Sequence, residues 1–138
     1  QLFRKTMKLD LTQTKRSALI EFDLPARPER FKKEVVLSLR YRVLSRHTYV
    51  RVRVNSLCSL YLGESSKRRK KKEANVKGML VNVSDRDYIT EAFFLPEELF
   101  KWNEHNQLQL YLGRWPSSDD GPFFGAMISR VEVRIEAS

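Results

Sequence analysis

The sequence predicts an all-β fold in which two antiparallel sheets pack face to face. Apolar and polar residues alternate at a period of two along most of the chain, which is typical of half-buried strands. No long helix is predicted, so no helical crossover is available to join parallel strands. About eight strands and one short helical turn fit in 138 residues, which favours a single β-sandwich domain spanning 1–138 with its core at about 7–136.

The N-terminal half contains four alternating runs. They span 7–11, 20–24, 35–44 and 50–55, and a stretch at 57–62 continues the last one as a bulge or as a second short strand. In the third run one face is apolar, whereas the other carries Arg40 and Arg42. This second face is therefore expected to be mostly exposed to water.

The C-terminal half resumes the alternation after a basic segment. Strands are predicted at 79–83, 89–95, 107–112 and 131–136. The one helical turn is predicted at 96–102, because Pro96 suits the first helical position and two glutamates follow it at the positive helix end. Leu99 and Trp102 lie three residues apart on this turn and are expected to plug the end of the sandwich.

The net charge of the chain is concentrated in one segment. Lys and Arg number 26 against 17 Asp and Glu, which gives +9. Six of these charges are consecutive, so the remainder carries only 9 − 6 = +3; the six residues are Lys67, Arg68, Arg69, Lys70, Lys71 and Lys72. Because adjacent like charges repel and nothing apolar is available to bury, the sequence predicts a solvated, mobile loop at 63–77.

Several partners fit such a basic loop. Its charges can bind the phosphates of nucleic acid, anionic lipid headgroups or sulfated glycans, and the same run is compatible with a nuclear import signal. The alternative is an insert with no specific partner. The sequence shows no signal-peptide pattern and no apolar run of the ~18 residues needed to span a membrane, so it leaves the compartment open.

Four arginines on two of the alternating runs form a second candidate anion-binding set: Arg40, Arg42, Arg51 and Arg53. If the two strands are neighbours, the four guanidinium groups make one positive patch, which requires a bound anion or carboxylates such as Glu132 and Glu136 between them. The alternative is a solvated face with cross-strand ion pairs. Tyr41 and Tyr49 are expected to face inward, which argues against base stacking beside these arginines.

The loop at 113–125 is the candidate carbohydrate-binding segment. An indole ring can stack on a sugar ring while charged side chains bond to sugar hydroxyls. The residues that offer these groups are Trp115, Arg114, Asp119 and Asp120. The alternative is a surface loop held down by Phe123 and Phe124.

No set of residues recommends catalysis or metal binding. His47 and His105 fall in predicted turns without metal-ligand spacing, and the single Cys58 can form neither an internal disulfide nor a cysteine-based zinc site. Cys58 is expected to be a small buried hydrophobe. The sequence predicts no catalytic residue, no metal site and no cofactor, and therefore a protein that is not itself an enzyme.

Four short segments carry a resemblance to a known fold family. They are VRVRVN at 50–55, AFFLPEEL at 92–99, NEHNQLQL at 103–110 and ISRVEV at 128–133. In this order they resemble the galactose-binding-like jelly rolls, and in particular the non-catalytic carbohydrate-binding modules of polysaccharide lyases and other glycan-active enzymes. The resemblance covers about 18–136. Ser56 stands where the family usually has Gly, and Glu104-His105 stands where Gly usually precedes Asn106.

This resemblance implies jelly-roll topology and a non-catalytic recognition module that binds carbohydrate through its edge loops, attached to a larger glycan-processing enzyme. The residues themselves support two other roles. One is a protein-interaction or scaffold domain, and the other is binding of a polyanion through the basic loop.

Overall fold

A computed structural model describes residues 2–31, 34–44, 48–63, 77–85, 88–114 and 125–135. Over these ranges the chain forms two antiparallel sheets and one 3-10 turn, which confirms the predicted all-β sandwich. Nine strands are seen rather than about eight, because 57–62 is a separate strand after a turn. The elements are β1 (Phe3–Leu11), β2 (Ser17–Asp23), β3 (Glu34–Val43), β4 (Thr48–Val54), β5 (Cys58–Gly63), β6 (Lys77–Asp85), β7 (Tyr88–Pro96), η1 (Glu97–Leu99), β8 (His105–Arg114) and β9 (Ala126–Ile135).

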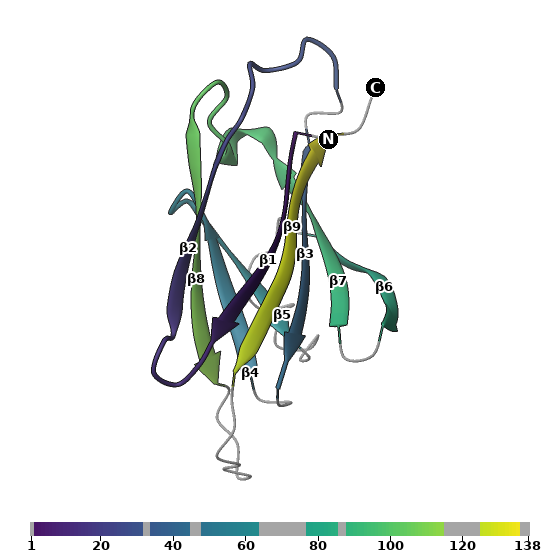
Figure 1. The fold of residues 1–138 in the computed structure, drawn as a ribbon. Helices are drawn as coiled ribbons and strands as arrows, with labels where there is room; N and C mark the ends of the chain where they lie inside the picture. The colour runs from purple at the N-terminus through teal and green to yellow at the C-terminus, as the bar shows by residue number, and fades with distance from the viewer. Residues whose placement is uncertain are drawn as a thin grey trace.

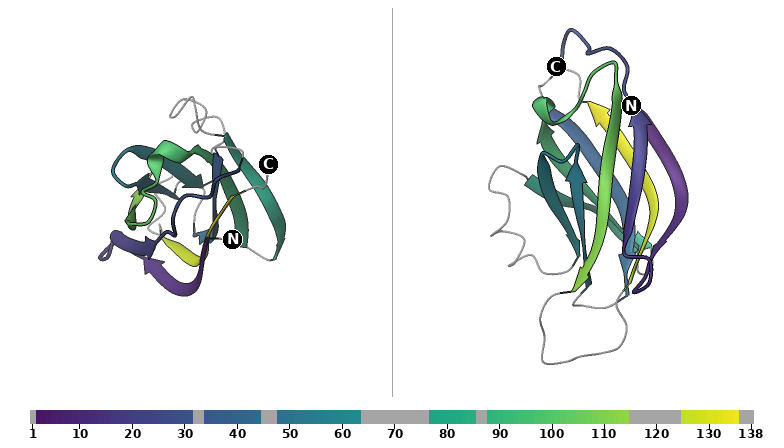
Figure 2. Two further views of the ribbon diagram at one scale, coloured as in Figure 1. Left: turned by 90° about the horizontal axis from the view of Figure 1, so that it is seen from above. Right: turned by 90° about the vertical axis from the view of Figure 1, so that its left-hand side faces the viewer.

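The first four strands alternate between the two sheets. The five-stranded sheet has the order β1-β9-β3-β7-β6, and the four-stranded sheet has the order β2-β8-β4-β5 (Figure 1). Figure 2 shows the same two layers from above and from the side of β2 and β8. All the pairings between neighbouring strands in these ranges are antiparallel, as expected for strands without helical crossovers.

The core lies between the inner faces of the sheets and follows the period-two pattern of the sequence. In β4 the side chains of Val50, Val52 and Val54 are fully buried, and Leu110 of β8 and Phe93 of β7 pack in the same cluster. Side chains on one strand alternate between faces, so the residues between these valines point to the outer surface.

One polar contact inside the core links the two sheets. The Tyr41 hydroxyl, on β3, donates a hydrogen bond to Oε1 of Glu91 on β7 at 2.8 Å. The Tyr41 hydroxyl oxygen in turn accepts a hydrogen bond from the backbone N–H of Gly63 on β5 at 3.2 Å. Glu91 is fully buried. Tyr41 therefore faces inward, as predicted, and connects the five-stranded sheet to the four-stranded one.

The helical turn is shorter than predicted. It covers Glu97–Leu99, and Pro96 precedes it as the last residue of β7, with φ −59° and ψ 143°, rather than occupying its first position. Leu99 and Trp102 pack against the core cluster, and Trp102 meets the Phe31 ring edge-on with 5.7 Å between ring centroids. The predicted packing role of these two residues is confirmed.

Candidate functional site

Most of the residues predicted for carbohydrate binding fall outside the described ranges. These are Trp115, Asp119 and Asp120, and the same holds for the six basic residues 67–72. Arg114 is the last residue of β8 and pairs with Thr48 at the start of β4. Both edge-loop predictions therefore stay predictions.

The four arginines do not form one patch. Arg40 and Arg42 lie on β3 in the five-stranded sheet, whereas Arg51 and Arg53 lie on β4 in the four-stranded sheet. The condition for a single patch, that the two strands are neighbours, is not met, because the chain crosses to the other sheet between them. Glu132 forms an ion pair with Arg4 of β1 at 3.8 Å, and Glu136 lies outside the described residues.

The outer surface of β8, β4 and β5 carries a group of aromatic and cationic side chains, here named the tyrosine–arginine face. Strand register arranges it in three rows across the three strands. The rows are Gly113–Tyr49–Gly63, then Tyr111–Arg51–Tyr61, then Gln109–Arg53–Ser59.

The expectation that Tyr49 faces inward is wrong. Val50 and the following alternate residues of β4 fill the core, so the position before Val50 must point outward. Tyr49 is half-buried there, and its ring lies 5.7 Å from the Tyr61 ring with a 53° tilt between the ring planes. The pair therefore stands on the outer surface of two adjacent strands.

A glycine makes room for the Tyr49 ring. A Cβ at Gly113 would lie 2.1 Å from Cζ and 2.4 Å from the hydroxyl oxygen of Tyr49, so the hydroxyl end of the ring occupies the space that any other side chain would need. On the other side of Tyr49, Gly63 has φ +135°, a conformation that favours glycine. The ring thus lies across β8 instead of standing away from the sheet.

Arg51 lies at the centre of the face. Its Cζ is 4.8 Å from the centroid of the Tyr111 ring, within the range of a cation–π contact. Nη2 of Arg53 donates a hydrogen bond to the carbonyl of Ser56 at 3.0 Å. Aromatic rings beside guanidinium, amide and hydroxyl groups form the mixture of apolar and polar surface that small-molecule sites share.

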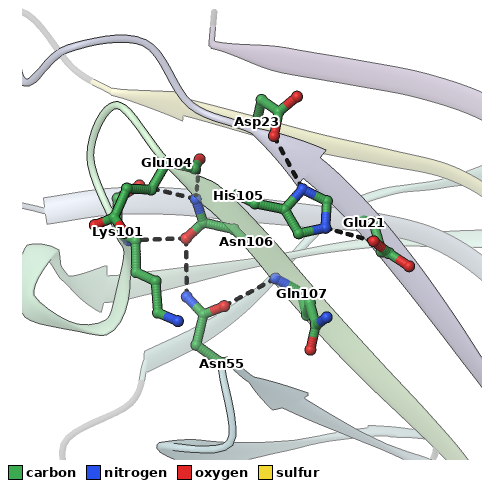
Figure 3. Close-up of polar contacts among 8 residues, drawn as sticks. All are labelled: Glu21, Asp23, Asn55, Lys101, Glu104, His105, Asn106 and Gln107. Atoms are coloured by element: carbon green, nitrogen blue, oxygen red, sulfur yellow. Dashed lines mark hydrogen bonds and ion pairs between the residues drawn. The ribbon is translucent and has the colours of Figure 1, made fainter.

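A second cluster of ionisable groups lies where β2 pairs with β8. His105 is the first residue of β8 rather than part of a turn, and its two ring nitrogens contact Asp23 and Glu21 of β2 (Figure 3). The Nδ1–Oδ1 distance to Asp23 is 2.9 Å. The carboxylates lie on opposite sides of the ring and do not converge on one point. Within the described ranges, no group of three or more His, Cys, Asp or Glu side chains is arranged to hold a metal ion.

This cluster predicts a pH-dependent contribution to stability. Hydrogen bonds to Asp23 and then to Glu21 raise the pKa of His105 above its ordinary value of 6.5. A raised pKa in the folded state stabilises the fold below the unfolded pKa, and this contribution is lost as the pH rises through the folded pKa. We expect the urea midpoint of unfolding to be higher for wild type than for His105→Gln at about pH 6. At about pH 9 the difference between the two midpoints is expected to vanish. An equal difference at both pH values would contradict this assignment.

Three of the four segments that carry the resemblance, 50–55, 92–99 and 103–110, meet at a corner built on two asparagines (Figure 3). Asn106, fully buried, accepts hydrogen bonds from Asn55 Nδ2 and the Lys101 N–H, both at 2.8 Å, and donates to the carbonyls of Lys101 and Glu104. Oδ1 of Asn55 accepts from the Gln107 N–H at 2.8 Å. Every polar group of the Asn106 side chain is thus used inside the fold, which indicates a structural role.

The turn after β4 holds Ser56 in a backbone conformation that favours glycine. Asn55 and Ser56 have φ values of 49° and 59°, in the left-handed region. Glycine adopts this region without strain, whereas other residues do so less readily. Ser56 adopts it as well, and its hydroxyl contacts the Gln109 side chain at 3.3 Å.

Two open hollows in the described surface lie away from the tyrosine–arginine face. One, of about 510 Å³, is lined by Leu2, Phe3, Arg4 and Thr6. The other, of about 340 Å³, runs between β1 and β2 beside Met7 and Leu19. Both follow the β1 edge of the sandwich and contain neither the tyrosines nor Arg51.

Comparison of the chain with protein-family models and with curated proteins finds no match. Over the part of the chain that the structure describes, no helix has both the length and the apolar character needed to cross a membrane.

Proposed function

We propose that this chain is a non-catalytic carbohydrate-binding module with galactose-binding-like, jelly-roll topology, and that the tyrosine–arginine face holds the sugar. The strand order supports the topology. Without the edge strand β6, two sheets of four strands remain, β1-β9-β3-β7 and β2-β8-β4-β5, between which the chain alternates as in a jelly roll, except at the β4–β5 hairpin. This site differs from the edge loop at 113–125 that the sequence favours.

The observation that carries the proposal is the pair of tyrosine rings held on the open face of a sheet. Tyr49 fits across β8 only because Gly113 has no side chain, and Tyr61 stands beside it on the neighbouring strand. Tyrosine supplies a large apolar surface at a small entropic cost, since it has only two side-chain torsions. An aromatic pair that is already in place before binding is suited to stacking against sugar rings.

The remaining members of the face supply polar partners for sugar hydroxyls. Gln109 and Ser59 lie on either side of Arg53 in one row, so amide, guanidinium and hydroxyl groups lie beside the aromatic rows. All three side chains are half-buried and on the outer surface. A mostly apolar contact area with a few directed polar groups is what carbohydrate and other small-ligand sites share.

Substitution of the tyrosines tests the site. In affinity electrophoresis with xylan, galactan, laminarin, dextran and polygalacturonate, we expect wild type to be retarded by at least one polymer, and Tyr61→Ala to bind about tenfold more weakly. Gly113→Ala keeps every tyrosine but displaces the Tyr49 ring, so it is expected to weaken binding as well.

Tyr88→Ala is the matched control, because Tyr88 also stands beside an arginine but lies on the outer surface of the other sheet. It is expected to bind like wild type. Retardation by none of the polymers, or equal losses in Tyr61→Ala and Tyr88→Ala, would overturn the proposal. Loss of binding in Trp115→Ala alone would place the sugar-binding site in the loop at 113–125 instead.

A further inference from the structure

We infer that the tyrosine–arginine face selects acidic glycans, that is, polysaccharides whose sugars carry carboxylate or sulfate groups. This inference rests on the proposed function and names the ligand class of the same face. It depends on the position of Arg51 and on the absence of acidic residues from the strands that form the face, in contrast to two described arginines elsewhere that form ion pairs.

Arg51 presents an oriented positive charge in the middle of the aromatic rows. It lies between Tyr111 and Tyr61 in strand register, and its guanidinium group stacks on the Tyr111 ring at 4.8 Å. Stacking of this kind restricts the planar group while its N–H donors stay available at the edges, where they match a carboxylate or a sulfate. A sugar ring on the tyrosines would place its substituents beside this group.

The strands that form the face contain no acidic residue. The sequences of β4, β5 and β8 include neither Asp nor Glu. Arg51 and Arg53 lie two residues apart on one face of β4, so their Cα atoms are only about 7 Å apart. Within the described residues, neither arginine forms an ion pair with a carboxylate. Two like charges this close repel each other, and an anion bound between them relieves that repulsion.

Two arginines elsewhere on the described surface have carboxylate partners. Arg27 forms an ion pair with Glu97 at 3.0 Å, and Arg4 pairs with Glu132 at 3.8 Å. The nearest carboxylates on the four-stranded sheet, on β2, are held by His105. Among the described residues, Arg51 and Arg53 therefore differ from Arg4 and Arg27, because no carboxylate offsets their positive charge.

The test compares polymers that share a backbone and differ in charge. The pairs are polygalacturonate with its fully methyl-esterified form, and dextran sulfate with dextran. Residues 67–72 are replaced by Ser in the full chain, so that the basic segment does not contribute. In this background we expect the acidic member of at least one pair to bind about tenfold more tightly than the neutral member.

Arg51→Gln is expected to remove that preference, because it keeps a polar side chain but no charge. Arg51→Lys keeps the charge but loses the planar group that stacks on Tyr111. This variant is expected to keep only part of the preference for the acidic polymer. Arg40→Gln is the matched control, since Arg40 also stacks on a tyrosine, Tyr88 at 4.3 Å, but on the opposite sheet. It should leave the preference unchanged. Circular dichroism of each variant establishes that the fold is retained.

The outcomes separate this inference from the proposed function. Equal binding of acidic and neutral polymers, with Tyr61→Ala weakening both, would overturn the acidic selectivity and leave carbohydrate binding in place. Binding to none of these polymers, nor to xylan, galactan or laminarin, would overturn both. Tighter binding of a single-stranded oligonucleotide than of either acidic polymer, lost in Arg51→Gln, would show that the ligand of the face is nucleic acid.

Discussion

Asn106→Ala is expected to lower the free energy of unfolding by about 3 kcal/mol, because it leaves buried backbone groups without partners. The Asn106 amide satisfies the N–H and the carbonyl of Lys101 and also bonds to Asn55 and to the carbonyl of Glu104. Alanine can replace none of these bonds, and the site is fully closed to solvent.

Urea unfolding followed by circular dichroism measures this loss. Asn106→Asp separates the two halves of the network, since a carboxylate accepts the bonds from Lys101 and Asn55 but cannot donate to the carbonyls. It should therefore also be less stable than wild type, because one carboxylate oxygen then faces two carbonyl oxygens in a buried site. Asn103→Gly is the control, because Asn103 is exposed in the same corner and its φ of 57° suits glycine. A change below about 1 kcal/mol in Asn106→Ala would rule out the structural role of this network.

Tyr41→Phe is expected to lower the free energy of unfolding by about 2 kcal/mol, although it removes a single oxygen atom. That oxygen donates to Glu91 and accepts from the Gly63 N–H, which lie on β7 and β5. Phenylalanine keeps the packing of the ring but leaves both groups without this partner in a buried setting, where an unsatisfied polar group is costly.

Tyr88→Phe provides the matched comparison in the same urea experiment. Its hydroxyl lies 3.6 Å from Sδ of Met127, a weak acceptor, in a half-buried position. This variant is expected to change the free energy of unfolding by less than about 0.5 kcal/mol. Equal effects of the two substitutions would mean that the Tyr41 hydroxyl contributes nothing beyond the ring.

The sandwich could be predicted from the sequence because burial follows the period of the strands. The alternation in 50–55 reappears as three fully buried valines, and Leu99 and Trp102 pack at the end of the core as expected. The corner could be predicted in outline from 92–99 and 103–110. The burial of Glu91 could not be predicted, because a single carboxylate inside an apolar run does not indicate that it bonds to the Tyr41 hydroxyl.

The tyrosine–arginine face was beyond sequence reasoning because it depends on which strands pair. Periodicity assigns residues to faces, but it does not say that β4 pairs with β8 and β5 instead of with β3. Arg51 meets Tyr111 only through that pairing. Tyr49 was a different case, since strict alternation from Val50 already requires it to face outward.

The placement of the face on β4 and β5 has a consequence for how it assembles during folding. These strands are consecutive and are joined by the turn at Asn55, Ser56 and Leu57, so they pair without a long loop closure. Their hairpin alone brings together Tyr49, Tyr61 and both arginines of the face. Tyr111 and Gly113 arrive on β8, a distant part of the chain, whose docking is the slower, topology-limited step. We expect the two tyrosines and two arginines of β4 and β5 to come together in the first stage, and the Tyr49 ring to reach its position over Gly113 only in the second.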